Sequence, residues 1–348
     1  MAIKLGIIGY GGMAGWHHEN SARVPDVEVV AAYDIDPERV KLAREKGLTG
    51  YDTLEEFLKD ERVNLVLVAT PNDVHCELTC AALEAGKHVI CEKPVALNLE
   101  QLDKMISTAK RKGLIFTTHQ NRRWDKDFVT TKAVIESGTL GKVYAIQSRL
   151  HGMGGVMHGW RGVKAQGGGM LFDWGVHFID QIYFMLGYDE ITSCKCVLQS
   201  VKNPDVDDYF QMVLDTKSGT QVTIEIGTFV LRENPRWLVM GDEGTMHIND
   251  FEANGAITKV NTLIEDVPVI VMTSAGPTRT FAPRPKEVKL ELPLPQLDPQ
   301  WTELYANVRD TIDGKAELIV QPWQIRKVLA LIMAGFESAA TGKQIDIA

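Results

Sequence analysis

Short hydrophobic runs recur along the first 120 residues, and between them apolar side chains return every three or four positions. The runs lie at residues 3–8, 27–33, 64–69, 88–92 and 114–118. Runs of this length, rich in β-branched residues, are typical of strands buried on both faces, and the spacing between them is typical of amphipathic helices. The alternation therefore predicts a doubly wound α/β domain with a parallel sheet.

A second pattern begins after residue 122. Segments of alternating apolar and polar residues follow one another at 142–150, 191–201, 207–215, 220–230, 236–241 and 244–249. Helix-like segments lie at 125–137, 171–186, 298–312 and 322–341. Such alternation predicts a large, open and mostly antiparallel sheet. We therefore predict two domains, an α/β domain at residues 1–122 and an α+β domain at residues 123–348.

Residues 252–297 interrupt the second pattern. The segment is irregular and rich in proline. A connection of this length without regular structure is unusual inside a compact domain. We expect either an arm that covers a neighbouring subunit or the active site, or a plain surface excursion.

Composition narrows the class of protein. The chain has 348 residues, of which 45% are hydrophobic and 24% are charged, with a net charge of −9. These values are typical of a globular protein, and no dense run of lysine and arginine favours nucleic-acid binding. No apolar stretch approaches the ~20 residues needed to cross a bilayer, and the N-terminus does not resemble a signal peptide. We expect a cytoplasmic protein without a nucleic-acid or membrane partner. Its five cysteines lack the spacing of disulfide frameworks or zinc sites, so we also expect no metal site.

A glycine motif follows the first strand and opens a helix. Gly9, Gly11 and Ala14 form the GxGxxA pattern, with Gly12 and Met13 between them. In this pattern the first glycine permits a tight turn, the second allows the backbone to approach a pyrophosphate, and the small third residue allows close packing of helix and strand. Because the helix N-terminus also offers free N–H groups, the motif predicts a Rossmann domain that binds a dinucleotide.

Asp34 lies at the end of the second strand, where a carboxylate can accept hydrogen bonds from the adenosine ribose. Its charge would repel a 2′-phosphate, so we expect NAD rather than NADP as the cofactor. Asp36 is explained as the N-cap of the next helix, because Pro37 follows it. Arg39 lies on that helix, although no arginine directly follows Asp34.

Candidate chemistry lies at the ends of further strands. Lys93 follows the buried strand 88–92, and a lysine at such a place is costly unless it reaches a cleft. Asp173 and His177 are four residues apart after a glycine-rich segment, so they share one face of a predicted helix. Each of these features also has an explanation without function. Lys93 could belong to a solvated pair with Glu92, and Asp173 and His177 could form a surface hydrogen bond.

Together these motifs resemble the Gfo/Idh/MocA oxidoreductases, the family of glucose–fructose oxidoreductase and inositol dehydrogenase. The resemblance spans most of the chain and rests on the glycine motif, Thr70-Pro-Asn72 with His75, Glu92-Lys93-Pro94, Asn121-Arg122, and the glycine-rich run with Asp173, His177 and Asp180. It implies a Rossmann domain joined to an open, mostly antiparallel sheet. It also implies NAD(P)-dependent hydride transfer at a CH–OH group of a sugar or polyol, and a cis bond between Lys93 and Pro94.

The resemblance assigns roles to residues of this chain. It implies Lys93, Asp173 and His177 as catalytic groups, with His177 as general base, Lys93 stabilising alkoxide charge and Asp173 orienting the base and a substrate hydroxyl. We expect cofactor contacts from Gly9, Gly11, Gly12, Met13, Ala14, Asp34, Thr70, Asn72, His75, Glu92 and Lys93. We expect substrate contacts from Lys93, Asn121, Arg122, His151, His158, Trp160, Arg161, Asp173 and His177.

Several functions remain open at this point. The aromatic, methionine and histidine content of residues 151–161 resembles that of family members that act on glycosides. This resemblance implies oxidation of a pyranoside C3 hydroxyl that prepares elimination by a partner enzyme. The alternatives are an inositol or polyol dehydrogenase, a ketosugar reductase, a redox-neutral enzyme with permanently held NAD, and a non-catalytic NAD sensor. Because the predicted antiparallel sheet has an open face, we also expect a homo-oligomer.

Overall fold

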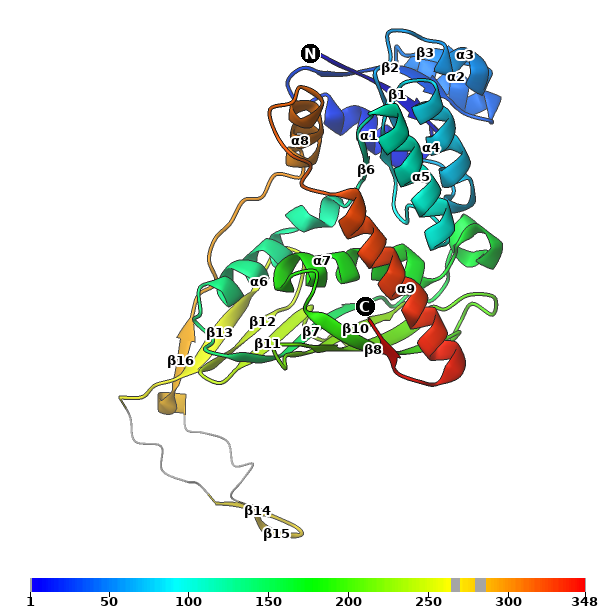
Figure 1. Cartoon of the computed structure of the whole chain (residues 1–348). Helices are drawn as coiled ribbons and strands as arrows, with labels where there is room; N and C mark the ends of the chain where they lie inside the picture. Colours follow the sequence, from blue (N-terminus) through cyan, green and yellow to red (C-terminus); the bar gives the residue numbers. More distant parts are fainter. Residues whose placement is uncertain (1, 264–269, 279–285, 348) are drawn as a thin grey trace.

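The computed structural model describes residues 2–263, 270–278 and 286–347. Two sheets divide it into an upper and a lower part, with the N-terminus on the upper one (Figure 1). The upper sheet is the predicted parallel sheet and the lower one is the predicted open sheet. The exact domain boundary at residue 122 stays a prediction.

The upper sheet has six strands in the order β3-β2-β1-β4-β5-β6, and all of its described pairs are parallel. The strands are β1 (Ile3–Ile8), β2 (Val27–Tyr33), β3 (Thr49–Tyr51), β4 (Leu65–Val68), β5 (His88–Cys91) and β6 (Phe116–Thr118). The helices are α1 (Gly12–Ser21), α2 (Pro37–Glu45), α3 (Leu54–Leu58), α4 (His75–Glu84) and α5 (Leu99–Lys112), with a 3₁₀ turn η1 (Asn72–Val74). The predicted Rossmann topology is confirmed. The edge strand β3 was missed because three partly buried residues leave no hydrophobic run.

The lower sheet has nine strands in the order β16-β13-β12-β11-β7-β10-β9-β8-β17. The strands are β7 (Val143–His151), β8 (Ile191–Gln199), β9 (Tyr209–Thr216), β10 (Gln221–Gly227), β11 (Trp237–Gly241), β12 (Gly244–Ile248), β13 (Gly255–Val260), β16 (Lys289–Leu292) and β17 (Ile345–Asp346). β7 and β10 pair in parallel, and the other described pairs are antiparallel. The expectation of a mostly antiparallel sheet is confirmed.

The expectation that residues 252–297 are irregular is wrong for four short strands. β13 and β16 pair with each other and extend the lower sheet beyond β12. They were missed because both are short and only Ile257 among their residues is fully buried, so the hydrophobic signal is weak. A small hairpin, β14 (Val271–Thr273) and β15 (Gly276–Thr278), lies outside both sheets. The rest of the predicted arm, at 264–269 and 279–285, lies outside the described residues.

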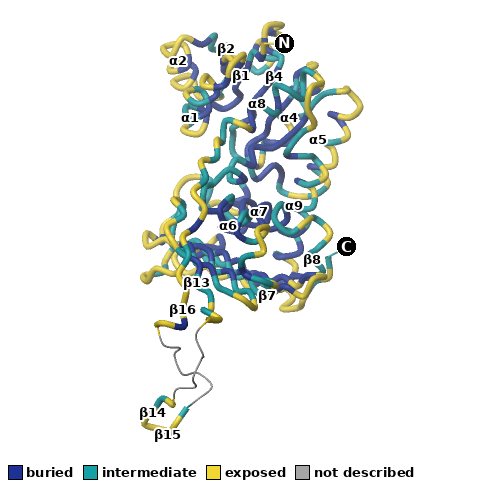
Figure 2. The backbone as a smooth tube through the Cα atoms, turned by 90° about the vertical axis from the view of Figure 1, so that its left-hand side faces the viewer, coloured by how far each residue is buried: buried dark blue, intermediate teal, exposed yellow. Residues whose placement is uncertain are grey.

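Helices cover one face of the lower sheet. They are α6 (Lys126–Glu136), α7 (Val176–Leu186) and α9 (Pro322–Thr341), and buried residues gather between them and the strands (Figure 2). Phe210, Met212 and Leu214 of β9 point into this layer and are fully buried. Gly335 permits the close approach of α9, because a Cβ there would lie 2.6 Å from the Met212 side chain. Among the described residues, no α-helix lies against the opposite face of the sheet (Figure 1).

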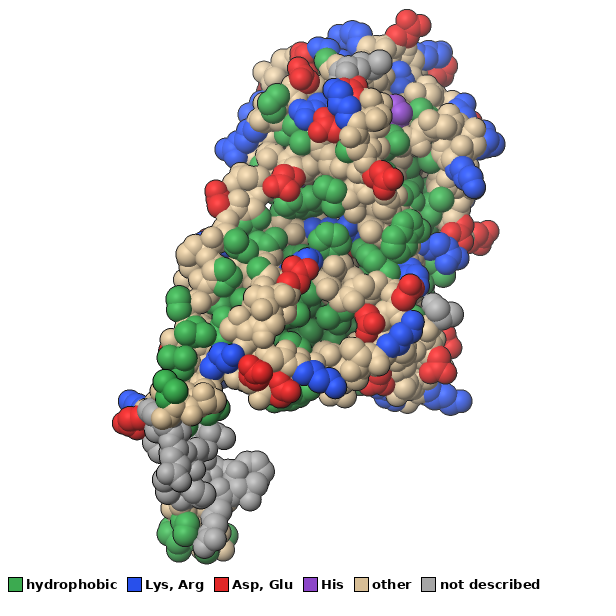
Figure 3. Space-filling model, turned by 60° about the vertical axis from the view of Figure 1, so that its left-hand side comes forward, with side chains coloured by type: hydrophobic (Ala, Val, Ile, Leu, Met, Phe, Trp, Pro, Cys, Tyr) green, Lys and Arg blue, Asp and Glu red, His purple; other side chains and the backbone are tan. Residues whose placement is uncertain are grey.

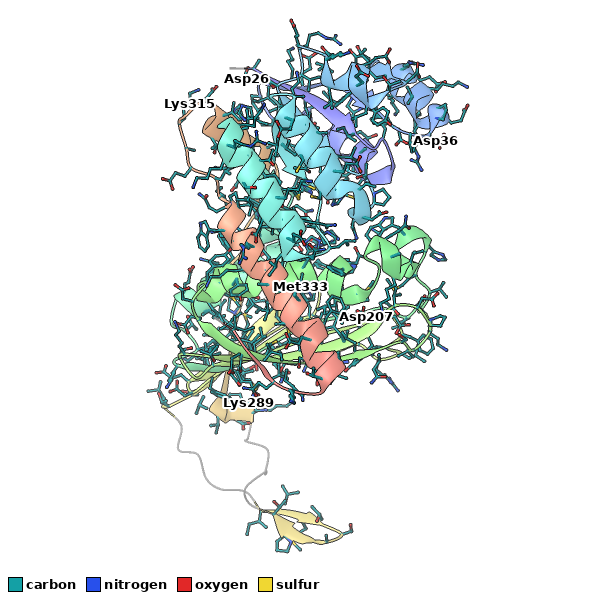
Figure 4. All side chains as sticks on the ribbon, turned by 45° about the vertical axis from the view of Figure 1, so that its right-hand side comes forward. Asp26, Asp36, Asp207, Lys289, Lys315 and Met333 are labelled. Atoms are coloured by element: carbon teal, nitrogen blue, oxygen red, sulfur yellow. The ribbon has the colours of Figure 1, made fainter. Side chains whose placement is uncertain are left out.

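The end of the chain joins the two parts. α8 (Glu303–Ile312) lies against the upper part, where Arg309 Nη1 donates to the Pro25 carbonyl at 2.7 Å. α9 then runs from the upper part down across the lower sheet, with Met333 on its length (Figure 4). Hydrophobic side chains gather across the middle of the molecule, between the two parts (Figure 3). No helix of the described residues is long and apolar enough to cross a membrane.

Candidate active site

The glycine turn lies between β1 and α1. Gly9 has φ of +89°, and a Cβ there would lie 2.7 Å from the Ala69 carbonyl oxygen, so the turn requires glycine. Gly11 is the N-cap of α1, a Cβ on Gly12 would meet nothing within 4 Å, and Ala14 is fully buried. Gly11 and Gly12 line a cavity of about 500 Å³. Open space beside a helix N-terminus fits the pyrophosphate of a dinucleotide.

Asp34 is fixed beside this turn. Its Oδ2 accepts from the Tyr10 N–H at 2.6 Å, and its Oδ1 accepts from the Asp36 N–H at 2.9 Å. Arg39 reaches the same place, with Nη1 3.4 Å from the Tyr10 carbonyl oxygen, and it contributes to the cavity wall. Met13, in the first turn of α1, is 43% exposed. A carboxylate and a guanidinium therefore both border the turn.

The loop after β4 is tied to the rest of the junction. Asn72 is buried, and its Nδ2 donates to the Gly167 carbonyl at 3.1 Å, which joins this loop to the glycine-rich segment of the lower part. His75 is also buried, with one ring nitrogen 2.9 Å from the Pro94 carbonyl oxygen and the other 2.9 Å from that of Thr70. The structure thus gives His75 a supporting place between two loops.

Lys93 and Asp173 meet across the junction of the two parts. The bond between Lys93 and Pro94 is cis, as expected. Lys93 Nζ donates to Asp173 Oδ1 at 2.9 Å and to its carbonyl oxygen at 2.7 Å. Arg161 Nε donates to Asp173 Oδ2 at 2.9 Å. Burial alone would raise the pKa of Asp173, but the charges of Lys93 and Arg161 hold it below its usual value. Asp173 is therefore ionised at neutral pH.

His177 lies in the first turn of α7, directly after a π-helical turn, η5 (Leu171–Gly175), that carries Asp173. The imidazole is buried, and within the part of the chain that the structure describes its Nδ1 has no hydrogen-bond partner. Burial, followed by the charges of Lys93 and Arg122, brings its pKa well below the usual value. A neutral imidazole with a free nitrogen can accept a proton at neutral pH.

Arg122 borders the same region. It lies on η2 (Asn121–Trp124), where Asn121 is half-buried. Its guanidinium lies 4.2 Å from the centre of the Trp174 ring and 5.2 Å from that of Phe251. Arg122 Nη1 donates to Asp125 at 2.8 Å. Stacking and ion pairing hold this cation in one orientation beside the π-helical turn that carries Asp173.

The predicted substrate residues of the segment after β7 lie in different places, and only some of them lie near Asp173. Arg161 lies on η3 (Gly159–Gly162), stacks on Trp160 at 4.5 Å and reaches Asp173. His158 is exposed. His151 lies elsewhere, with Nε2 3.7 Å from Glu225, whose strand neighbours point into the helix-covered layer. The structure therefore does not bring His151 to Lys93, Asp173 and His177, because the alternation of β7 turns it toward the helix-free face.

Glu92 points inward, into a buried polar network. Its Oε1 lies 2.7 Å from His17 Nε2 and 2.9 Å from His119 Nδ1, and its Oε2 accepts from the Lys93 N–H at 3.1 Å. Tyr305 of α8 hydrogen-bonds to the other ring nitrogen of His17. Sequence reasoning missed these partners, because they come from four separate segments and no spacing connects them.

His17, Glu92 and His119 are also a group whose ligand atoms, within 4.8 Å of one another, could hold a metal ion. The contacts of Glu92 with His17 and His119 are better explained by hydrogen bonds than by a shared metal ion. At 2.7 and 2.9 Å, both nitrogens lie at ordinary hydrogen-bond distance from the same carboxylate oxygen. Hydrogen bonding thus accounts for the group as it stands.

Comparisons with known proteins agree with an N-terminal Rossmann domain followed by a second domain. The family model described as "Oxidoreductase family, NAD-binding Rossmann fold" of Gfo/Idh/MocA matches residues 3–120, and the model of the Gfo/Idh/MocA C-terminal domain matches residues 128–247. A solved NAD-binding protein from Listeria innocua is 39% identical with a TM-score of 0.94, and the match covers 100% of both chains.

Several curated relatives carry named activities, and two of them differ in substrate. The scyllo-inositol 2-dehydrogenase (NADP(+)) IolW of Bacillus subtilis is 28% identical, over 99% of this chain and 95% of that protein. The D-glucoside 3-dehydrogenase of Escherichia coli is 33% identical over 198 residues, which are 55% of this chain and 56% of that protein. With both domain models matched in order over most of its length, the chain belongs to the Gfo/Idh/MocA family of oxidoreductases.

Proposed function

We propose that the chain is a dehydrogenase that transfers a hydride between a nicotinamide cofactor and a secondary hydroxyl or ketone of a sugar or glycoside. The observation that carries this proposal is the contact of Lys93 with Asp173 across the junction, beside the neutral His177. An ammonium group, a carboxylate and a proton acceptor are the groups that oxidation of an alcohol requires.

Each group has a task in this reaction. A bound dinucleotide, with its pyrophosphate beside Gly11 and its adenosine ribose beside Asp34, would supply the hydride acceptor through its nicotinamide ring. The neutral His177 imidazole takes the hydroxyl proton. The Lys93 ammonium stabilises negative charge on the substrate oxygen, and Asp173 holds the ammonium in place. In the opposite direction the same groups reduce a ketone.

Glycosides are the substrate class that we favour. Trp160 offers a flat ring next to Arg161, which pairs with Asp173. Aromatic rings can pack against the apolar face of a sugar. Oxidation of a pyranoside C3 hydroxyl is the specific reaction proposed, and it is the reaction named for the Escherichia coli relative. Inositol or polyol oxidation is the alternative, and it is named for the Bacillus subtilis relative.

We propose NAD as the preferred cofactor. Asp34 is held by two backbone N–H groups beside the glycine turn, where its charge disfavours a 2′-phosphate. Arg39 in the cavity wall makes NADP the alternative. Titration of the purified protein with both oxidised cofactors tests this preference, with tighter binding of NAD as the expected result and tighter binding of NADP as the contrary one.

The proposed activity is tested with a panel of glycosides, free hexoses and inositols, with each cofactor, by following the absorbance of the reduced nicotinamide. Turnover of at least one glycoside that disappears in His177→Ala supports the proposal. Absence of turnover with every substrate, together with intact cofactor binding, would favour the non-catalytic sensor. Nucleotide that is released only on denaturation would favour an enzyme with permanently held cofactor.

Two further expectations belong to this proposal. A homo-oligomer would cover the helix-free face of the lower sheet, where Val197 is 44% exposed. A cytoplasmic location agrees with five free cysteines, because reducing compartments keep thiols unpaired. Sedimentation velocity and cell fractionation test these expectations.

A further inference from the structure

The buried network around Glu92 lies outside the catalytic steps described above. Glu92 is 7% exposed, and His17, His119 and Tyr305 are at most 1% exposed. A carboxylate at such a depth is costly unless several donors satisfy it. The network must therefore be explained by what its hydrogen bonds hold in place.

The protonation states in the network follow from its geometry. Burial would raise the pKa of Glu92, but its contacts with His119 and His17 bring the pKa well below the usual value, so the carboxylate is ionised. An ionised carboxylate only accepts, so His17 Nε2 and His119 Nδ1 each donate to it. Burial and the neighbouring His119 lower the pKa of His17 to about 4, so His17 is neutral and its Nδ1 accepts from the Tyr305 hydroxyl.

The remaining carboxylate oxygen acts on the catalytic turn. Glu92 Oε2 accepts from the backbone N–H of Lys93, directly before the Lys93–Pro94 bond. The Lys93 side chain then reaches Asp173 in the lower part. One carboxylate thus connects α1, the segment after β6 and α8 to the turn from which the catalytic ammonium extends.

We propose that Glu92 is a positioning residue for the proposed reaction: its carboxylate, held by His17 and His119, fixes the Lys93–Pro94 turn, and Tyr305 ties this turn to α8. This inference rests on the proposed function and departs from the expectation that Glu92 contacts the cofactor. Both carboxylate oxygens are already engaged by protein donors, so the side chain acts through Lys93.

Glu92 also contributes charge near the proposed base. Lys93, Arg122 and His119 act on His177 to lower its pKa, and Glu92 acts to raise it. Asp173 lies on the preceding turn, where Lys93 and Arg161 pair with it. Removal of the Glu92 charge therefore lowers the pKa of His177 further and makes it a weaker base.

The test compares Glu92→Gln with Glu84→Gln, an exposed glutamate on α4 that pairs with Arg111. Glutamine keeps the shape of Glu92 and removes its charge. We expect hydrogen exchange to become about tenfold faster in peptides of the Lys93–Pro94 turn, which loses its carboxylate acceptor, and of α8, because His17, which holds Tyr305, loses the carboxylate that orients it. Thermal melting verifies that both variants are folded.

Kinetic and binding measurements complete the test. A misplaced ammonium should lower kcat about 100-fold, with KM for the sugar and Kd for NAD within about twofold of wild type, and the acid limb of kcat/KM should move to lower pH. Unchanged exchange in both segments would overturn the proposal. A large loss of NAD affinity with preserved kcat would also overturn it, in favour of direct cofactor contact, and so would a stoichiometric metal ion in the purified protein. If wild type transfers no hydride, the proposed function fails, but the exchange data still decide whether Glu92 holds the turn.

Discussion

Two buried carboxylates contact Lys93, and the protein balances their charges in different ways. Asp173 faces two cations, Lys93 and Arg161, and the Arg161 side chain is 42% exposed. Glu92 instead faces two imidazoles and the backbone N–H of Lys93, all within the interior. Asp173 can therefore exchange its contact with the partly exposed Arg161 for a contact with a substrate that enters the site. The Glu92 site is closed and serves to hold its neighbours.

This difference separates groups that react from groups that position. A cation near the surface can leave a carboxylate and bind a substrate oxygen, because water and substrate compensate for the lost pair. A buried network has no such exchange, and breaking it leaves an unsatisfied polar group. We expect variants of the Asp173 site to alter chemistry, and variants of the Glu92 site to alter geometry and stability.

The largest effect is expected for His177→Ala. Loss of the general base should lower kcat by about 10²–10⁴-fold without weakening cofactor binding. Because the pKa of His177 is held well below its usual value, wild-type kcat/KM for oxidation should stay level as the pH falls through 6.5 and decline only at lower pH. His247→Ala on β12 is the control. A wild-type acid limb centred at or above 6.5 would contradict the assignment.

Lys93→Ala should lower kcat by about 10²–10³-fold, since the substrate oxygen loses its electrostatic partner. Lys59→Ala, a lysine whose side chain is 72% exposed, provides the matched control. Calorimetric titration with NAD should show unchanged affinity. Retained turnover would show that the junction contact has no catalytic role.

Arg161→Ala should change substrate binding more than chemistry. Lys93 remains on Asp173 in this variant, so kcat should change little. KM for a glycoside should rise about tenfold, because one polar contact and the stacking on Trp160 are lost. Initial rates over a range of substrate concentrations separate the two constants. A fall in kcat with constant KM would place Arg161 in the chemical step instead.

The smallest effect on turnover is expected for Tyr305→Phe. The variant leaves His17 Nδ1 buried without a donor, at a cost of about 1–3 kcal/mol in the free energy of unfolding. Denaturant unfolding measures this cost, and Tyr144→Phe, at a tyrosine that is 51% exposed, is the control. Equal stability of the two variants would remove Tyr305 from the network.

The comparison also shows what the sequence could predict. The glycine motif and the parallel strands depend on neighbours in the chain, and local patterns predicted them. The hydrogen bonds of His17, His119 and Tyr305 to Glu92 depend on packing between distant segments, and no spacing indicated them. β13 and β16 were missed for a related reason, because short, mostly exposed strands at the end of a sheet carry little hydrophobic signal.

The most direct test of the central claim is a crystal structure of the protein with NAD and a glycoside bound. The account predicts that nicotinamide C4 lies about 3–3.5 Å from the sugar carbon, with the hydroxyl on that carbon between Lys93 Nζ and the His177 ring. A sugar bound with its reactive carbon away from both side chains would contradict the account.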